Sequence, residues 1–178
     1  MNLKHDVAEN KYQQYRDRAL EQARRNLPIQ IRDKVKFRNI DNEALLIAKV
    51  WESSPLRKEL PWSFAQGFKK WAFRHPNRLD LAVWYENNLC SLSIGFPTKT
   101  GKSMRLDVIE KNPCNYPLDK SIFAINIVAF EEFADLIGAD KIKIMRPLND
   151  RLINFYRSYG FIYQKSKGSE PEHLWKYL

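Results

Sequence analysis

The spacing of hydrophobic and polar positions changes several times along the chain, and each change predicts an element. From about Asp6 to Arg25 the apolar positions are few and helically spaced, which is typical of a helix on the outside of a domain or against a partner. Leu27-Pro28 ends this helix. Apolar and charged residues then alternate from Lys34 to Ile40, which predicts a first strand. Asp41 comes next and is the expected N-cap of a second helix.

The middle of the chain predicts two helices followed by a β-meander. The second of these helices begins with a proline, which suits the first turn of a helix. Three segments rich in β-forming residues come next, separated by turns that contain Glu86 and Gly101. In order, these helices and strands are expected at Asn42–Glu52, Pro61–Phe73, Leu79–Tyr85, Leu89–Phe96 and Met104–Ile109.

The segment from Ile122 to Gly138 is apolar almost all the way round. A helix there must be covered on most of its sides, as the central helix of an α/β layer is. Gly138 is the expected cap of this helix, and Lys141–Met145 is expected to be a short strand. The final strand is expected at Leu174–Tyr177.

A short helix and strand are predicted between those last two strands, within NDRLINFYRSYGF, which runs from Asn149 to Phe161. An apolar stripe covers one helix face, and a glycine stands where a left-handed C-cap is needed. From spacing alone this is an ordinary αβ unit. The run also resembles the last helix-strand unit of the GNAT superfamily of N-acetyltransferases. That pattern is Asn, two residues of any kind, a small or aliphatic pair, two of any kind, Tyr, three of any kind, and Gly-Phe. The matching positions are Asn149, Leu152, Ile153, Tyr156, Gly160 and Phe161.

The order of predicted elements from about Val35 to Leu178 also resembles the acetyltransferase order. Both have a strand, two helices, three antiparallel strands, a buried helix, a strand, a helix and two strands. The resemblance therefore implies an α+β fold with a mixed, mostly antiparallel sheet flanked by helices. We expect residues 34–178 to form this acetyltransferase-like domain and residues 1–33 to form an extra N-terminal helical extension.

The resemblance also implies a binding place for acetyl-CoA, in a V-shaped opening between the strands Met104–Ile109 and Lys141–Met145. The pantetheine arm would pair with main-chain groups near Val108 and Ile109, and Asn149 would lie beside the arm. These three residues are the expected contacts at the thiol end of the cofactor.

Transfer to an amine needs an acid for the departing thiolate and a base for the amine. The resemblance implies that Tyr156 directs its hydroxyl at the thioester sulfur, and a phenol with a pKa near about 10 is protonated at neutral pH. Glu110 is the first candidate for the base, with Asp107 and Glu86 behind it. Each residue also has a plainer explanation. The tyrosine suits a helix packed on the sheet, and the carboxylates suit a solvated surface.

The segment before the buried helix departs from the family pattern. The pyrophosphate loop of the family reads Arg or Gln, two residues of any kind, Gly, any residue, and Gly or Ala. This chain has NPCNYPLDKSIF there, with no glycine between Gly101 and Gly138. Glycines let backbone N–H groups approach phosphate closely at a helix N-terminus. The remaining candidates for phosphate binding are Lys120 and Ser121.

Three nearby residues oppose phosphate binding. Asp119 would repel phosphate or merely cap the helix, and Pro113 and Pro117 remove two N–H donors from the loop. Acetyl-CoA is the cofactor that the resemblance implies, and its phosphates would have to bind without the glycine-rich loop of the family.

The composition also indicates the class of protein and the cellular compartment. At 178 residues and 44% apolar content the chain suits one domain with a substantial core. A polar N-terminus, without the apolar core of a signal peptide, and the lack of a long apolar stretch predict a protein that is neither secreted nor membrane-spanning. Cys90 and Cys114 have no CxxC spacing and no nearby histidine, so neither a disulfide framework nor a metal site is expected, and the reducing cytoplasm is the expected location. His5, His75 and His173 are expected on the surface.

The net charge of +9 leaves two classes of function open. In the first, the protein is an N-acetyltransferase that acetylates a primary amine of a small molecule, a protein or an aminoacylated tRNA. In the second, it is a non-catalytic binding module of the same fold whose basic surface holds a nucleic acid or protein partner. No recognition helix, RNA-binding signature or zinc finger accompanies the charge. The expected acceptor pocket, from Trp51 to Trp71 and the strand ends, carries no recognisable motif, and its aromatics are typical of a core.

Overall fold

The computed structural model describes residues 3–58, 60–114, 116 and 118–178. Its helices are α1 (Leu3–Arg25), α2 (Ile29–Arg32), α3 (Asn42–Glu52), α4 (Phe64–Arg74), α5 (Ile122–Ile137) and α6 (Asp150–Arg157). Its strands are β1 (Val35–Arg38), β2 (Leu79–Tyr85), β3 (Asn88–Gly95), β4 (Ser103–Leu106), β5 (Val108–Lys111), β6 (Lys141–Met145), β7 (Ile162–Gln164) and β8 (His173–Tyr177). The expected element order is confirmed, except that the short helix α2 is added and one expected strand is divided into β4 and β5.

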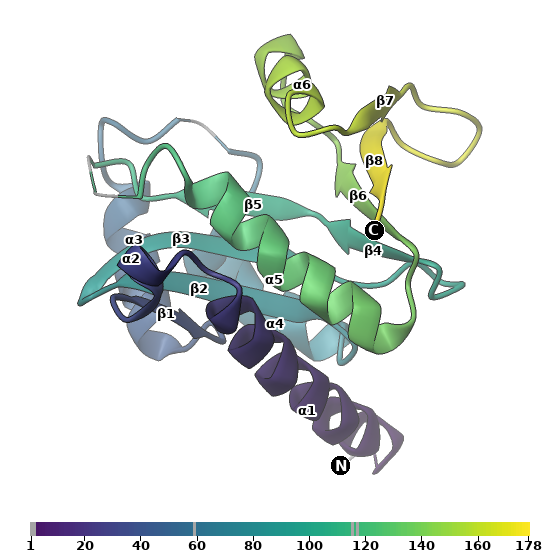
Figure 1. The fold of residues 1–178 in the computed structure, drawn as a ribbon, viewed down its shortest axis with the longest axis horizontal. Helices are drawn as coiled ribbons and strands as arrows, with labels where there is room; N and C mark the ends of the chain where they lie inside the picture. The colour runs from purple at the N-terminus through teal and green to yellow at the C-terminus, as the bar shows by residue number, and fades with distance from the viewer. Residues whose placement is uncertain (1–2, 59, 115, 117) are drawn as a thin grey trace.

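The strands form two four-stranded sheets (Figure 1). The first sheet has the order β1-β2-β3-β5 and is antiparallel throughout. The second has the order β4-β6-β8-β7, in which only the β4–β6 pair is parallel. The mixed, mostly antiparallel α+β architecture is therefore confirmed, although it is divided between two sheets.

The division corrects the single strand that the sequence predicts over Met104–Ile109. The N–H of Asp107 donates to the carbonyl of Ile94 at 2.9 Å, while the register of β5 pairs that same Ile94 with Val108. Two residues thus face one, which is a β-bulge, and a bulge bends a strand and increases its twist. The bend ends β4 in the second sheet and begins β5 in the first.

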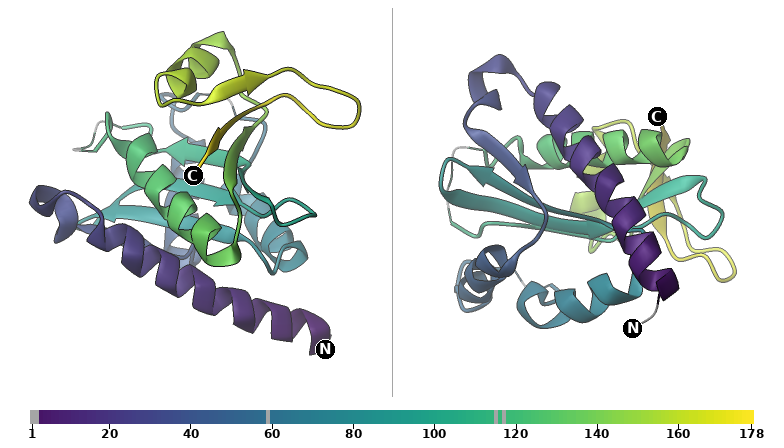
Figure 2. Two further views of the ribbon diagram at one scale, coloured as in Figure 1. Left: turned by 45° about the vertical axis from the view of Figure 1, so that its right-hand side comes forward. Right: turned by 90° about the horizontal axis from the view of Figure 1, so that it is seen from below.

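Helices cover both faces of the first sheet (Figure 2). α1 and α5 pack on one face, and α3 and α4 on the other. Because both faces are covered, β2 is buried at every position except its last, Tyr85. The aliphatic residues Leu81 and Val83 enter the α1–α5 core, and Ala82 and Trp84 enter the α3–α4 core.

The predicted helix ends agree with the structure at several points. The side chain of Asp41 accepts a hydrogen bond from the N–H of Ala44 and so caps α3. Gly138 caps α5 with φ at 74°, and Gly160 has φ at 83° in the turn after α6. These left-handed conformations favour glycine.

The N-terminal helix α1 belongs to the main core despite its thin apolar stripe. Ala19, Leu20 and Ala23 are buried there, and α1 packs along α5. The guanidinium of Arg16 is fully buried, where Nη1 donates to the carbonyls of Pro76 and Arg78, each at 3.2 Å. A polar side chain therefore fixes α1 to the start of β2.

A network of charges surrounds this attachment. Glu9 of α1 accepts hydrogen bonds from both Arg16 and Arg78, and Arg78 Nε donates to Asp80 Oδ1 at 2.9 Å. The other oxygen of Asp80 accepts from the N–H of Ile40 at 2.8 Å. Two arginines thus meet two carboxylates, so the buried charges are balanced.

One surface assignment from the sequence is wrong. His173 in β8 is 2% exposed, because the turn before it folds back and its Nδ1 lies 2.9 Å from the carbonyl oxygen of Pro171. His5 and His75 are half-buried, each stacked on a phenylalanine ring. Among the described residues, no helix combines the length and apolar character needed to cross a bilayer.

Candidate functional site

The pairing of β4 with β6 ends where the chain leaves β4 and passes from the second sheet to the first. These strands pair in parallel from Ser103 opposite Lys141 as far as Leu106 opposite Ile144. Beyond that pair, the bulge at Asp107 carries the chain into β5, which is an edge strand of the first sheet. In the described part of the chain no strand pairs with the outer edge of β5. By the register with β3, the main-chain groups of Val108 face Ile94, and those of Ile109 face the open edge beside the parting strands.

Asp107 stands at this parting point with one oxygen unsatisfied. Its side chain is 14% exposed, and Oδ1 accepts a hydrogen bond from Arg105. Its Oδ2 is buried without a partner among the described residues. Burial raises the pKa of Asp107, although the charges of Arg105 and Arg146 lower it. A buried carboxylate oxygen without a donor is unusual and is a candidate contact for a ligand.

Arg105 is held in place by an aromatic stack. Its guanidinium lies 4.4 Å from the ring centre of Phe96, and that ring stacks on His75 at 4.0 Å. Desolvation lowers the pKa of His75, and the charge of Arg105 lowers it further. The sequence contains no local signal for this stack, because its members are far apart in the chain: His75 follows α4, Phe96 follows β3 and Arg105 lies in β4.

Glu110 has both carboxylate oxygens engaged. Its side chain is 4% exposed, and Arg57 donates to Oε1 at 2.6 Å and to Oε2 at 3.2 Å. Arg57 also donates to the carbonyl of Trp62, and its hydrogen bond to Glu110 raises the arginine pKa. The pair joins the segment between α3 and α4 to β5.

Glu86, the third candidate carboxylate, lies elsewhere. It occupies the turn between β2 and β3 and pairs with Lys34, just before β1, at 3.7 Å. Because β1 and β5 are at opposite edges of the first sheet, the structure does not bring Glu86 to Asp107.

Tyr156 is buried on α6, with 5% of its surface exposed. Burial raises its pKa to about 12, and its hydroxyl makes no hydrogen bond to another described residue. Asn149 is the N-cap of α6, and its Oδ1 accepts from the N–H of Leu152 at 3.0 Å. The two motif residues are therefore placed at opposite ends of the same short helix.

An aromatic cluster that sequence reasoning missed joins α6 to the first turn of α5. Phe123 lies at its centre, with ring centres 4.9 Å from both Tyr156 and Tyr159. Phe155 and Phe161 lie farther out, at 5.4 Å and 6.2 Å. The apolar character of the sequence around Phe123 predicts burial, but it does not predict which helix the ring contacts.

The segment before α5 holds the predicted phosphate contacts. Lys120 and Ser121 are both exposed, and the N–H of Ser121 is already bonded to the carbonyl of Leu118 at 2.9 Å. Asp119 pairs with Lys111 at 2.5 Å. Pro117, counted among the lost donors, lies outside the described residues, as does Asn115. The N–H groups of the first turn of α5 have no partner within the helix, as at any helix start.

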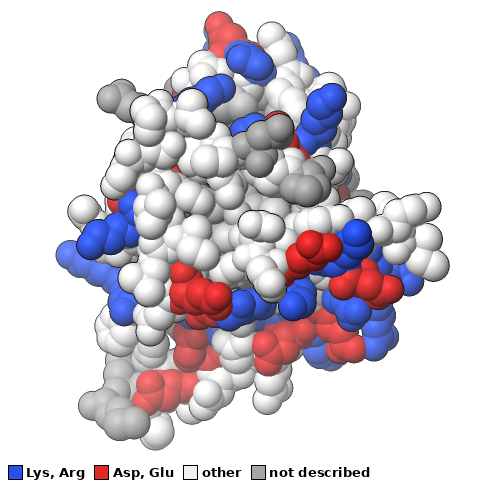
Figure 3. Space-filling model, turned by 90° about the vertical axis from the view of Figure 1, so that its left-hand side faces the viewer, with Lys and Arg blue, Asp and Glu red and all other residues white. Residues whose placement is uncertain are grey.

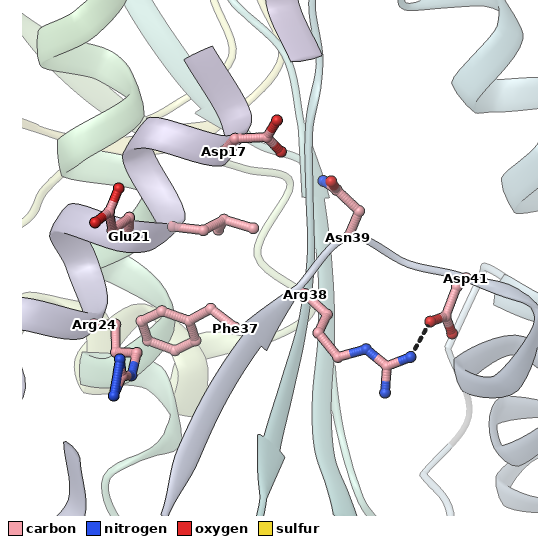
Figure 4. Close-up of a pocket in the computed structure, with 8 residues that line it drawn as sticks. Asp17, Glu21, Arg24, Phe37, Arg38, Asn39 and Asp41 are labelled. Carbon is pink, nitrogen blue, oxygen red and sulfur yellow. Dashed lines mark hydrogen bonds and ion pairs between the residues drawn. The ribbon is translucent and has the colours of Figure 1, made fainter. Parts of the chain in front are cut away.

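An open groove of about 470 Å³ lies between α1 and β1 (Figure 4). Phe37 points toward α1, and Arg38 points away toward Asp41, with which it pairs. On the α1 side, Arg24 lies 3.8 Å from Asp33. The charged rim residues are therefore largely matched by their own neighbours, and the groove presents no buried unsatisfied group among the described residues.

The positive charge is not gathered on the face that Figure 3 shows. Lysine and arginine side chains there alternate with aspartate and glutamate, most densely over the lower half of the view. Mixed signs of this kind do not form the continuous basic stripe that follows a nucleic-acid backbone.

Comparisons with solved structures identify the fold. An acetyltransferase of the GNAT family from Listeria monocytogenes superimposes with a TM-score of 0.55 at 13% identity, covering 81% of this chain and 95% of the other. The PaiA N-acetyltransferase of Thermoplasma acidophilum, solved in complex with coenzyme A, gives 0.55 at 15% identity, with 81% and 99% covered. A domain from Methanocaldococcus jannaschii gives 0.59 at 20% identity, with 82% and 99% covered.

These identities show a shared fold and no more. The chain has the α+β fold of the GNAT acetyltransferases, as its sequence predicts. No protein-family model matches the sequence, and a search of curated proteins finds no match.

Proposed function

We propose that this protein is an acetyl-CoA-dependent N-acetyltransferase that acts on a primary amine. The observation that carries the proposal is the parting of β4 and β6 beside the open edge of β5, with the unsatisfied Oδ2 of Asp107 at the parting point. A fold shared with acetyltransferases, one of them solved with coenzyme A, supports this choice.

The residues present fit the thiol end of the cofactor better than its phosphate end. The free main-chain groups of Ile109, next to Val108, suit an amide-bearing pantetheine arm, and the Asn149 amide nitrogen remains available beside its capping role. At the phosphate end, Lys120 and Ser121 supply a charge and a hydroxyl next to the first turn of α5, where backbone N–H groups attract anions.

Acetyl-CoA, when bound, supplies a thioester whose acetyl group passes to the amine nitrogen. Asp107 takes one proton from the incoming ammonium and releases it to solvent, because its raised pKa makes it a stronger base than an ordinary aspartate. As the carbon–sulfur bond breaks, the Tyr156 hydroxyl donates its proton to the sulfur. Tyr156 regains a proton from the nitrogen, so the products are an acetamide, a thiol and one released proton.

The proposal moves the base from Glu110 to Asp107. The two-point pairing with Arg57 means that Glu110 would have to break an ion pair before it could accept a proton. Glu110 instead has a positioning role, since it fixes the connection between α3 and α4 against the strand that carries Asp107.

A second candidate function is a non-catalytic binding module of the same fold. Two features favour it. The loop before α5 has no glycine to let backbone N–H groups approach phosphate, and the ring centre of Phe123 lies 4.9 Å from that of Tyr156, so the tyrosine is packed against α5.

Calorimetric titration with acetyl-CoA separates the two candidates. We expect micromolar binding that is weakened by Lys120→Ala and by Asn149→Ala, while Lys165→Ala, an exposed lysine beyond β7, leaves it unchanged. Lack of binding at millimolar acetyl-CoA would reject the transferase and leave the binding module.

A further inference from the structure

Two unusual residues follow the last paired positions of β4 and β6, one on each chain segment at the point where these strands part. Leu106 and Ile144 are the last paired residues. The next residue on one side is the bulged Asp107, and on the other side the chain reaches Arg146 after Met145. Arg146 has a left-handed φ of 47°. In a residue other than glycine such a conformation is strained, and strain of this kind gathers at ligand sites.

Most of the neighbouring polar groups are already occupied. Arg105 pairs with Asp107 Oδ1 and stacks on Phe96, although its buried Nε–H has no partner among the described residues. On the other side, the N–H of Arg146 donates to the carbonyl of Glu172, whose carboxylate accepts from the Tyr163 hydroxyl at 2.7 Å. These contacts hold both backbones and leave two charged groups without an ion-pair partner, beside the unpartnered Nε–H of Arg105.

The two remaining groups are Asp107 Oδ2 and the guanidinium of Arg146. Arg146 is exposed and forms no ion pair within the described part of the chain. It is near enough for its charge to act on Asp107, yet the two side chains are not in contact. A hydrogen-bond-accepting carboxylate oxygen and a guanidinium cation therefore lie on the two chain segments that part here, without pairing with each other.

We infer that the acceptor is an aminocarboxylate, with its ammonium bound by Asp107 and its carboxylate by Arg146. This inference rests on the proposed function and specifies its substrate class. The ammonium supplies the donor that Asp107 Oδ2 lacks, and the planar guanidinium matches a carboxylate with two parallel hydrogen bonds. Both ends of the acceptor are recognised only when both charges are on the same small molecule.

The test is a comparison of matched acceptors in an acetyl-CoA assay. A panel of α-, β- and γ-amino acids is measured beside amines that differ from them only in lacking the carboxylate. We expect at least one amino acid to exceed its matched amine in kcat/KM by about tenfold or more, the effect of a charged hydrogen bond. Equal kcat/KM for every matched pair would overturn the inference.

Substitution of Arg146 tests whether its charge binds the acceptor carboxylate or acetyl-CoA. Arg146→Gln keeps a side chain with the same backbone requirement, so it adds no new strain. We expect it to raise KM for the amino acid about tenfold, to leave KM for the matched amine and for acetyl-CoA unchanged, and to be partly rescued by Arg146→Lys. Arg18→Gln, an exposed arginine on α1, is the matched control and should change none of these values. An increase in KM for acetyl-CoA alone would contradict the inference and assign Arg146 to the cofactor.

Calorimetry of the same panel without acetyl-CoA distinguishes failure of the acceptor site from failure of the transferase. Binding of an amino acid that is lost in Arg146→Gln, in a protein that transfers no acetyl group, would retain the acceptor site and remove the transferase. Lack of both turnover and binding would overturn the acceptor site as well.

Discussion

At the scale of single residues, burial determines what each candidate can do. Tyr156 and Asp107 both have a raised pKa because burial disfavours their charged forms. For Tyr156 this keeps the hydroxyl protonated at any physiological pH. A thiol has a pKa near about 8.5, so full proton transfer from a phenol with a pKa of about 12 is uphill, and Tyr156 must recover a proton as it gives one.

Tyr156→Phe tests that role. We expect kcat to fall by about 10²-fold or more, the lower range for a general acid, while the affinity for acetyl-CoA stays within about twofold. Steady-state kinetics and calorimetry on the same preparation give both values. Phe123→Leu, a change in the adjoining ring that carries no proton, is the control and should lower kcat far less. Unchanged turnover in Tyr156→Phe would remove the tyrosine from the chemistry.

Asp107→Asn should lower kcat without lowering the free energy of unfolding at pH 7. A folded-state pKa above the unfolded value means that Asp107 favours folding below the unfolded pKa and loses this contribution as pH rises through the folded pKa. At pH 7 the neutral amide should therefore be at least as stable as the carboxylate, and the advantage should vanish below pH about 4. Urea denaturation at both pH values measures this, alongside an expected fall in kcat of about 10²-fold or more. A less stable variant at pH 7 would show that the Arg105 pairing outweighs burial.

At the scale of elements, the sequence predicts local periodicity well and long-range geometry poorly. The caps at Asp41 and Gly138 could be found because each depends on a few neighbouring residues. The split between β4 and β5 could not, because Met104 to Ile109 alternates like one strand and the bulge depends on the register with β3. The four-residue helix α2 is too short for a periodic signal.

The attachment of α1 is another long-range feature. Arginine is typical of surface positions. Arg16 is buried because it donates hydrogen bonds to the carbonyls of Pro76 and Arg78, which lie 60 and 62 residues away in the chain. α1 also packs along α5. We therefore propose that residues 1–33 are part of the folded domain and that residues 34–178 are less stable without them.

Arg16→Met tests that proposal. Removing one member of a buried charge network leaves Glu9 and Asp80 undercompensated, so we expect a loss of about 3–5 kcal/mol in the free energy of unfolding. Arg18→Met, one exposed position on the same helix, should change it by less than about 0.5 kcal/mol. Urea denaturation measures both. A similar small change in the two variants would show that the buried network does not hold α1 in place.

For the whole molecule, the order of helices and strands is enough to predict the fold by its resemblance to the acetyltransferases, without knowledge of any contact. Topology is encoded by many residues at once, so errors at single boundaries do not change it. The site depends on few residues, so the structure changes which carboxylate is the best candidate for the base. The position of Glu110 just past the strand favours it as the base, yet Arg57, 53 residues earlier, engages both of its oxygens. The β-bulge instead places Asp107 at the parting strands.

The central claim is that this site transfers an acetyl group to an amine. The most direct measurement is the initial rate of free CoA thiol release when the protein is mixed with acetyl-CoA and a panel of primary amines and amino acids, with mass spectrometry of the acceptor. We expect thiol release that requires an amine, one acetylated acceptor formed for each thiol, and loss of both signals in Asp107→Asn. Thiol release no faster than in the absence of protein, across the whole panel, would contradict the claim.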